Sequence, residues 1–289
     1  MAVFEPGGAN VVTAQPLGEI VLRPGREAVF SGILELWRYR ELAWTLTLRD
    51  ISVRYKQSLL GFAWVILQPA LTVLIFSILF GRLAKLPTEN NIPYPIFSLT
   101  GLLLWNFYST AATRASLSIV SNFNLVTKVY FPRMIVPISA ALVPVADFLV
   151  SLLLLIAVGL KYHPDIQLHV LLGPVFFLLA FFQVLGCSLW LAALHVRFRD
   201  VQYLLPFLVQ VLMYACPICY SSTIIPQNWI PFYYLNPVAV TIDGFRWAIL
   251  STSLPPVYAL TWLTISSLIL LTTGFYFFTS EEGHFSDKI

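Results

Sequence analysis

The sequence has few charged side chains. Only 11% of its 289 residues are Asp, Glu, Lys or Arg, and 58% are hydrophobic, whereas an average soluble domain carries about 25% charged residues. This shortage of charge excludes an ordinary soluble domain. It predicts an all-α polytopic membrane protein.

The residues that an ATPase, an enzyme or an ion pump requires are also scarce. No G-x-x-x-x-G-K-[ST] phosphate loop occurs, so we expect no ATP bound in that manner. The four His are scattered, and the three cysteines, Cys187, Cys216 and Cys219, have no His or second Cys pair near them. We therefore expect no catalytic residue, no metal and no cofactor in this chain, and thiols that serve in packing.

Long apolar runs are abundant instead. Residues 62–81 include no charged residue, and about 20 positions at roughly 1.5 Å each span a bilayer's hydrocarbon core of about 30 Å. Five further runs are long enough to cross, which predicts six transmembrane helices. These runs lie at about 95–120, 134–160, 169–196, 201–220 and 255–279.

Basic residues are unevenly distributed over this topology. Thirteen of the 17 Lys and Arg residues fall on one expected side of the membrane and four on the other, so the positive-inside rule places both termini in the cytoplasm. Residues 1–30 have no basic start followed by an apolar run and are expected to be a flexible cytoplasmic lead. The other expected divisions are an amphipathic interface helix over 31–61, a transmembrane domain over 62–279 and a cytoplasmic tail over 280–289.

A basic amphipathic segment precedes the first span. Trp37, Trp44, Leu48, Ile51 and Tyr55 recur at spacings of 7, 4, 3 and 4, which places them on one helical face. Such a helix lies in the headgroup layer with its aromatic side down; the alternative is a cytoplasmic helix packed on protein. The expected headgroup contacts are Trp37, Arg38, Trp44, Arg49, Arg54 and Lys56.

Two connecting segments carry turn and helix signals. Residues 121–133 open with capping residues and close at Pro132, which predicts a short cytoplasmic helix that suits a soluble partner as well as lipid headgroups. The outer segment after the fifth span is apolar and aromatic, but prolines interrupt it. Because irregular backbone at membrane depth must be covered by protein or water, we expect two short re-entrant or interfacial helices there, the second at about 237–250.

Few ionisable residues lie within the spans. Asp147 falls near the middle of the third span, where a carboxylate is costly and faces a cavity or a partner. Arg114 in the second span is the expected partner, with a direct role in transport as the alternative. Asp243 and Arg246 are expected to form a local i, i+3 pair in the outer segment.

Four blocks of the sequence resemble the membrane subunits of polysaccharide-exporting ABC transporters. They lie at 49–71, 124–140, 194–210 and 235–250 and keep the family's order and spacing, and the resemblance covers about residues 36–279. It implies a permease of the bacterial inner membrane without its own ATPase site. It also implies a homodimer of six-helix subunits, two separate ABC ATPase subunits that hold ATP and Mg, a lipid-linked glycan as substrate, and membrane lipids but no nucleic acid as further partners.

The same resemblance assigns residues to parts of the transporter. Residues 124–133 become a coupling helix on the ATPase, with Asn124, Lys128, Tyr130, Phe131 and Arg133 as contacts. The first and fifth spans line the channel, with Trp64, Gln68, Phe76, Tyr214 and Tyr220 as lining residues. The outer gate includes Asn236, Pro237, Asp243 and Arg246.

Two other functions remain open at this stage. An ABC exporter of a drug or a small lipid would share the same architecture. A membrane-embedded transferase acting on lipid-linked sugars is the alternative from a different class, although the clustered acids or nucleophile that it would need are not evident.

Overall fold

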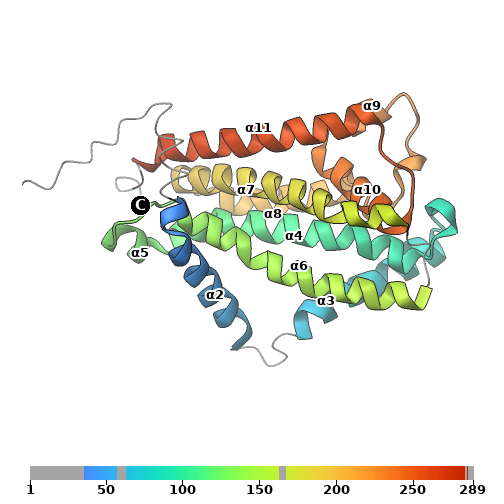
Figure 1. The fold of residues 1–289 in the computed structure, drawn as a ribbon, viewed down its shortest axis with the longest axis horizontal. Coiled ribbons are helices and arrows are strands. Elements are labelled where there is room, and N and C mark those ends of the chain that lie inside the picture. The colour runs from blue at the N-terminus through green and yellow to red at the C-terminus, as the bar shows by residue number, and fades with distance from the viewer. Residues whose placement is uncertain (1–35, 57–62, 163–166, 284, 286–289) are drawn as a thin grey trace, which may run out of the picture.

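The computed structural model describes residues 36–56, 63–162, 167–283 and 285. Within these ranges the chain forms a bundle of helices that run mostly side by side (Figure 1). In chain order the elements are α2 (Arg40–Lys56), α3 (Ala63–Phe76), η1 (Ser77–Leu83), η2 (Glu89–Asn91), α4 (Tyr94–Ser121), α5 (Phe123–Lys128), α6 (Ile135–Tyr162), η3 (Leu168–Leu172), α7 (Gly173–Arg197), α8 (Val201–Ala215), η4 (Ser222–Ile224), α9 (Ile230–Tyr233), α10 (Pro237–Leu250) and α11 (Val257–Glu282).

Four helical segments in the described ranges are long and apolar enough to cross a membrane: Ala63–Leu83, Ile135–Tyr162, Leu168–Arg197 and Val257–Glu282. α4 has 28 residues but carries Arg114 and many hydroxyl side chains, and α8 has 15 residues, fewer than the roughly 20 that a hydrocarbon core requires. The all-helical, multi-pass architecture is thus confirmed for this part of the chain. The count of six spans stays a prediction.

α4 is the central helix of the bundle, and this position explains its lower hydropathy. It packs against α3, α6, α7, α8 and α10, so most of its surface meets protein. Some of its buried hydroxyls are satisfied within the helix; Thr100 Oγ1 donates to the Phe97 carbonyl at 2.7 Å, and Ser118 Oγ to that of Ala115 at 2.7 Å. Others bind neighbouring segments, such as the Tyr94 hydroxyl, which donates to the Cys219 carbonyl at 2.6 Å.

α7 and α11 approach each other backbone to backbone. A Cβ added at Gly186 would lie 2.3 Å from the Leu270 carbonyl oxygen, and one added at Gly274 would lie 2.5 Å from the Gly186 carbonyl oxygen. Small residues at such crossings allow close packing of helices in membranes. Nearby, the Trp190 ring stacks on Phe277 with centroids 4.0 Å apart.

α10 does not cross the bundle but is buried within it; the prolines of the outer segment predict a short helix here, either re-entrant or interfacial. Its bounds match the expected second short helix, and Asn236 caps its start by accepting from the Val238 amide at 3.1 Å. It packs against α4, α7 and α11. The first expected short helix corresponds to η4 and the four-residue α9.

A buried glutamine holds α10 in place. Gln183 of α7 is 1% exposed; its Oε1 accepts from the Tyr108 hydroxyl of α4 at 2.8 Å. Its Nε2 donates to Thr241 Oγ1 of α10 at 3.2 Å and to Ser267 Oγ of α11 at 2.9 Å. One side chain therefore joins four helices.

Candidate functional site

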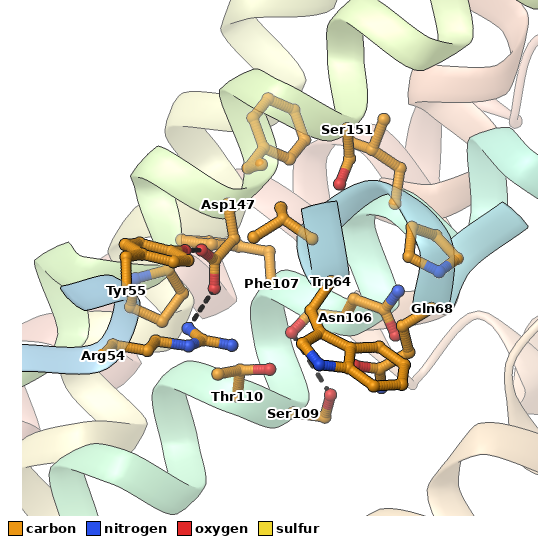
Figure 2. Close-up of a pocket in the computed structure, with 15 residues that line it drawn as sticks. Arg54, Tyr55, Trp64, Gln68, Asn106, Phe107, Ser109, Thr110, Asp147 and Ser151 are labelled. Carbon is orange, nitrogen blue, oxygen red and sulfur yellow. Dashed lines mark hydrogen bonds and ion pairs between the residues drawn. The ribbon is translucent and has the colours of Figure 1, made fainter. Parts of the chain in front are cut away.

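A polar hollow opens between the end of α2 and the helices α3, α4 and α6. Its volume is about 330 Å³, and α2, α3, α4 and α6 each contribute to its wall (Figure 2). The labelled lining residues are Arg54, Tyr55, Trp64, Gln68, Asn106, Phe107, Ser109, Thr110, Asp147 and Ser151.

Asp147 accepts two bonds from α2 at one side of this hollow. The Arg54 guanidinium and the Tyr55 hydroxyl both donate to its carboxylate, as Figure 2 shows. The expected partner, Arg114, makes no hydrogen bond or ion pair with it among the described residues, so that pairing was wrong. The physical reason is that α2 packs along α6 and brings its own arginine to Asp147.

Tyr55 serves as a hydrogen-bond donor in this cluster. Burial raises the pKa of its phenol far above the usual value, and the hydrogen bond to Asp147 raises the pKa further. The phenol therefore stays protonated at neutral pH. A carboxylate that would be costly at membrane depth is thus compensated by one cation and one neutral donor.

The rest of the hollow combines an aromatic ring with neutral polar groups. Trp64 and Gln68 lie on the first turns of α3, and Asn106, Ser109 and Thr110 lie along one face of α4. Trp64 is half exposed, and Gln68 is also exposed. Ring faces pack on apolar faces of sugars, and amides and hydroxyls hydrogen-bond to sugar hydroxyls; these side chains suit a carbohydrate better than an apolar ligand.

The five expected channel residues are not brought together. Trp64 and Gln68 line the hollow, whereas Phe76, Tyr214 and Tyr220 lie outside it. Phe76 packs edge to face on Phe80 with centroids 5.4 Å apart. The Tyr220 hydroxyl donates to the Tyr214 carbonyl at 3.2 Å, beside the outer segment.

The outer segment is organised by a buried ion pair. Arg246 Nη1 donates to Asp243 Oδ1 at 3.1 Å, one helical turn away, and both side chains are almost fully buried. Arg246 Nη2 also donates to the Pro217 carbonyl at 2.5 Å, and its guanidinium lies 3.8 Å from the centroid of the Phe97 ring. The i, i+3 pair thus exists, and it ties α10 to α4 and to the end of α8.

Sequence reasoning missed a second tie at this end. Glu89 accepts from Ser221 Oγ at 2.5 Å and from the amide and Oγ of Ser253 at 2.9 and 2.7 Å. It therefore joins the loops that follow η1, α8 and α10. A single acid in a polar loop gives no periodic signal, so the sequence offered no means of finding it.

The expected coupling segment is short and only partly exposed. α5 ends at Lys128, and Val129 is extended with φ −123° and ψ 131°. Asn124 and Lys128 are exposed, and Tyr130 is 77% exposed. Phe131, in contrast, is 6% exposed and belongs to the core, which argues against a direct contact with a partner.

Arg133 is held by the bundle itself. Its guanidinium donates to the Glu282 carbonyl at 2.7 Å, and its amide donates to the Glu282 carboxylate at 2.9 Å. Of the expected contacts at this end, Tyr130 is thus the most available apolar side chain.

α2 has one face on protein and one face free of it. Leu46 and Thr47 are buried against the bundle, whereas Trp37 and Trp44 of the predicted aromatic face are 71% and 60% exposed. Arg38 and Lys56 are exposed as well, while Arg49 and Arg54 point to acids. One face of this helix thus packs on protein, and contact of the exposed face with headgroups stays a prediction.

Among the described residues no group of three His, Cys, Asp or Glu side chains could hold a metal ion. Cys187, Cys216 and Cys219 are free thiols, and Cys216 Sγ lies 3.3 Å from Asn236 Nδ2.

Together, the apolar helices and the hollow define a multi-pass helical membrane protein with a polar, aromatic hollow at one side of the bundle.

Comparison with known proteins gives the family. The model described as ABC-2 type transporter matches residues 41–250, and the chain belongs to this family. The O-antigen export system permease protein RfbA of Myxococcus xanthus is 32% identical over 260 residues, covering 89% of this chain and 98% of that protein. Permeases of this family work with separate ABC ATPase subunits, which carry out ATP hydrolysis.

Two further relatives extend this comparison. An O-antigen export system permease protein RfbA of Klebsiella pneumoniae is 28% identical, over 86% of this chain and 94% of that protein. The polysialic acid transport protein KpsM of Escherichia coli is 25% identical, over 82% of this chain and 92% of that protein.

Proposed function

We propose that this chain is the membrane subunit of an ATP-driven exporter that moves a lipid-linked polysaccharide from the cytoplasm across the inner membrane. The glycan is of the O-antigen, capsule or teichoic acid type. The observation that carries the proposal is the match to almost the whole length of an O-antigen export permease. Drug export and glycan transfer have no comparable support.

The hollow between α2, α3, α4 and α6 supports a sugar substrate. Its wall offers Trp64 as a stacking surface and Gln68, Asn106, Ser109 and Thr110 as hydrogen-bonding groups. Neutral groups of this kind bind sugars weakly and release them readily, which suits a glycan that must pass through the permease. The hollow is therefore our candidate for the place where the glycan first meets the permease.

The proposed topology puts α2, α5 and both termini in the cytoplasm. α5 and the loop after it lie at the same end of the bundle as the end of α11 (Figure 1), and the positive-inside rule assigns that end to the cytoplasm. Two copies of the chain then pair with two ATPases that hold ATP and Mg. The outer end, with Asn236, Pro237, Asp243 and Arg246, forms the gate.

The exposed side chain of Tyr130 provides a test of the coupling contact. We expect Tyr130→Ala to reduce co-purification of the ATPase about tenfold or more, because a large exposed aromatic at an interface often carries about 1.4 kcal/mol or more. Tyr258→Ala is the matched control, since Tyr258 is 49% exposed at the opposite end of the bundle. Equal recovery of the ATPase with both variants would remove α5 and its loop from the interface.

The function itself is tested by deletion and by purification. Loss of surface polysaccharide in a deletion strain, restored by the intact gene, supports glycan export. An ABC ATPase that co-purifies one to one with a tagged copy supports the ATP-driven mechanism. Product formation from lipid-linked sugars by the isolated chain without ATP would instead favour a transferase.

A further inference from the structure

A second hollow lies between α2 and the cytoplasmic end of α4, and arginines dominate it. Its volume is about 360 Å³. Its polar lining residues are Arg49, Asp50, Arg54, Arg114, Ser121 and Asn122. Three guanidinium groups from two helices thus surround one small space.

The three arginines differ in their partners. Arg49 pairs with Asp50 at 2.8 Å and donates to Asn122 Oδ1 at 3.1 Å, and Arg54 pairs with Asp147. Arg114 has no carboxylate partner among the described residues, and its buried Nε has no hydrogen-bond partner there. A buried donor without a partner is costly, which points to a ligand that supplies the acceptor.

The charge balance around this hollow favours an anion. Three guanidinium groups face two carboxylates, and both carboxylates are already engaged by Arg49 and Arg54. Guanidinium groups bind phosphate oxygens through paired, charge-assisted hydrogen bonds. One positive charge, that of Arg114, is therefore in excess, and a bound anion would neutralise it and supply an acceptor for Arg114.

The hollow lies toward the end of α4 that the proposed topology places in the cytoplasm. Arg114 lies seven residues before the end of α4 at Ser121, which is about 10 Å along the helix. α2, whose Arg49 and Arg54 line the hollow, also exposes Trp44. A lipid headgroup can reach this position from the cytoplasmic leaflet, which is itself rich in phosphate.

The two hollows adjoin at one side chain, because Arg54 lines both. We propose that the arginine hollow binds the phosphate or pyrophosphate group of a membrane lipid through Arg49, Arg54 and Arg114. The identity of the lipid rests on the proposed function: the lipid is the carrier of the glycan, and its first sugar lies in the hollow lined by Trp64 and Gln68, next to Arg54. The phosphoryl site itself does not depend on that assignment.

Lipid binding to the purified chain tests the site. The full chain is prepared in a maltoside detergent, which contains no phosphate, and titrated with undecaprenyl pyrophosphate and separately with phosphatidylglycerol, with native mass spectrometry as the readout. We expect Arg114→Gln to weaken binding at least tenfold, and inorganic pyrophosphate to compete with the bound lipid. Arg199→Gln is the matched control, because Arg199 is exposed and lies outside both hollows.

The outcomes distinguish whether the phosphoryl site exists from which lipid occupies it. Tighter binding of undecaprenyl pyrophosphate supports the glycan carrier, and equal binding of phosphatidylglycerol supports the phosphoryl site but assigns it to bilayer lipid. Unchanged affinity in Arg114→Gln, or an equal loss in Arg199→Gln, overturns the proposal. If Arg114→Gln does not fold, Arg114→Lys replaces it, because lysine keeps the positive charge but lacks the paired N–H donors of a guanidinium. We expect this variant to bind the lipid at least threefold more weakly than the wild type. Wild-type affinity in Arg114→Lys would overturn the proposal.

This assay needs neither ATP nor an ATPase. A chain that binds the lipid but exports no glycan in cells would contradict the proposed function alone. A chain that exports but shows no lipid bound at Arg114 would contradict the phosphoryl site alone.

Discussion

Asp147 links α2 to α6, so a substitution at this residue measures how much that contact contributes to stability. Asp147→Asn leaves Arg54 without its counter-charge, but Arg54 is about a third exposed, so we expect a loss of about 1 kcal/mol in the free energy of unfolding rather than the several kcal/mol of a fully buried pair. Thermal unfolding in detergent measures this. Asp50→Asn, in the more exposed pair with Arg49, is the control and should cost less; a larger loss there would contradict our account of the cluster.

Gln183 permits a second prediction at the same scale. Gln183→Leu removes the acceptor of the buried Tyr108 hydroxyl and the donor to Thr241 and Ser267, so we expect a loss of about 1–3 kcal/mol. The double variant Gln183→Leu, Tyr108→Phe should lose less than the sum of the two single changes, because no hydroxyl remains unpaired. Strict additivity in thermal unfolding would show that the two side chains do not interact.

Single residues also show where sequence reasoning stops. Asp147 was identified as needing a partner because a lone carboxylate in an apolar run is costly. The partner came from α2, more than 90 residues away in sequence, and no spacing rule says which helix packs on which. Asp243 and Arg246 were predicted as a pair because one turn of one helix already brings them together.

At the scale of helices, the crossing of α7 and α11 is the most constrained contact. Even Gly186→Ala adds a Cβ that would meet the Leu270 carbonyl at 2.3 Å, so the two backbones must separate. We expect a loss of about 1–3 kcal/mol, the usual cost of overpacking, and lower yield from membranes. Gly283→Ala is the control, because its Cβ would meet nothing within 4 Å; equal stability of the two variants would refute the close contact.

The elements themselves were predicted to different degrees. The bounds of α10 were predicted from the prolines that interrupt the outer segment, because proline suits the first turn of a helix but not its interior. α4 was predicted as a span because its length fits a bilayer; its central position, packed against five other helices, follows from tertiary contacts that the sequence does not specify. For α2, Trp37 and Trp44 of the predicted aromatic face are exposed, but Tyr55 of the same face turns to Asp147. The buried face at Leu46 and Thr47 depends on the neighbour that covers it.

For the whole molecule, the proposed assembly has a stoichiometry that mass measurement can check. We expect two copies of this chain and two ATPases in the particle purified without ATP, because each exposed cytoplasmic loop would hold one ATPase. Native mass spectrometry of the complex in detergent gives the numbers directly. A stable particle with one copy of this chain and one ATPase would contradict the homodimer.

α4 contacts both regions that matter for the proposed transport. Asn106, near the middle of this helix, lines the hollow with Trp64 and Gln68, and Tyr108, two residues further on, binds Gln183, which contacts α10. A straight helix cannot shift at Asn106 and stay still at Tyr108. Under the proposed function, a glycan that enters the hollow and displaces α4 at Asn106 would therefore also move Tyr108, and through Gln183 the displacement would reach α10.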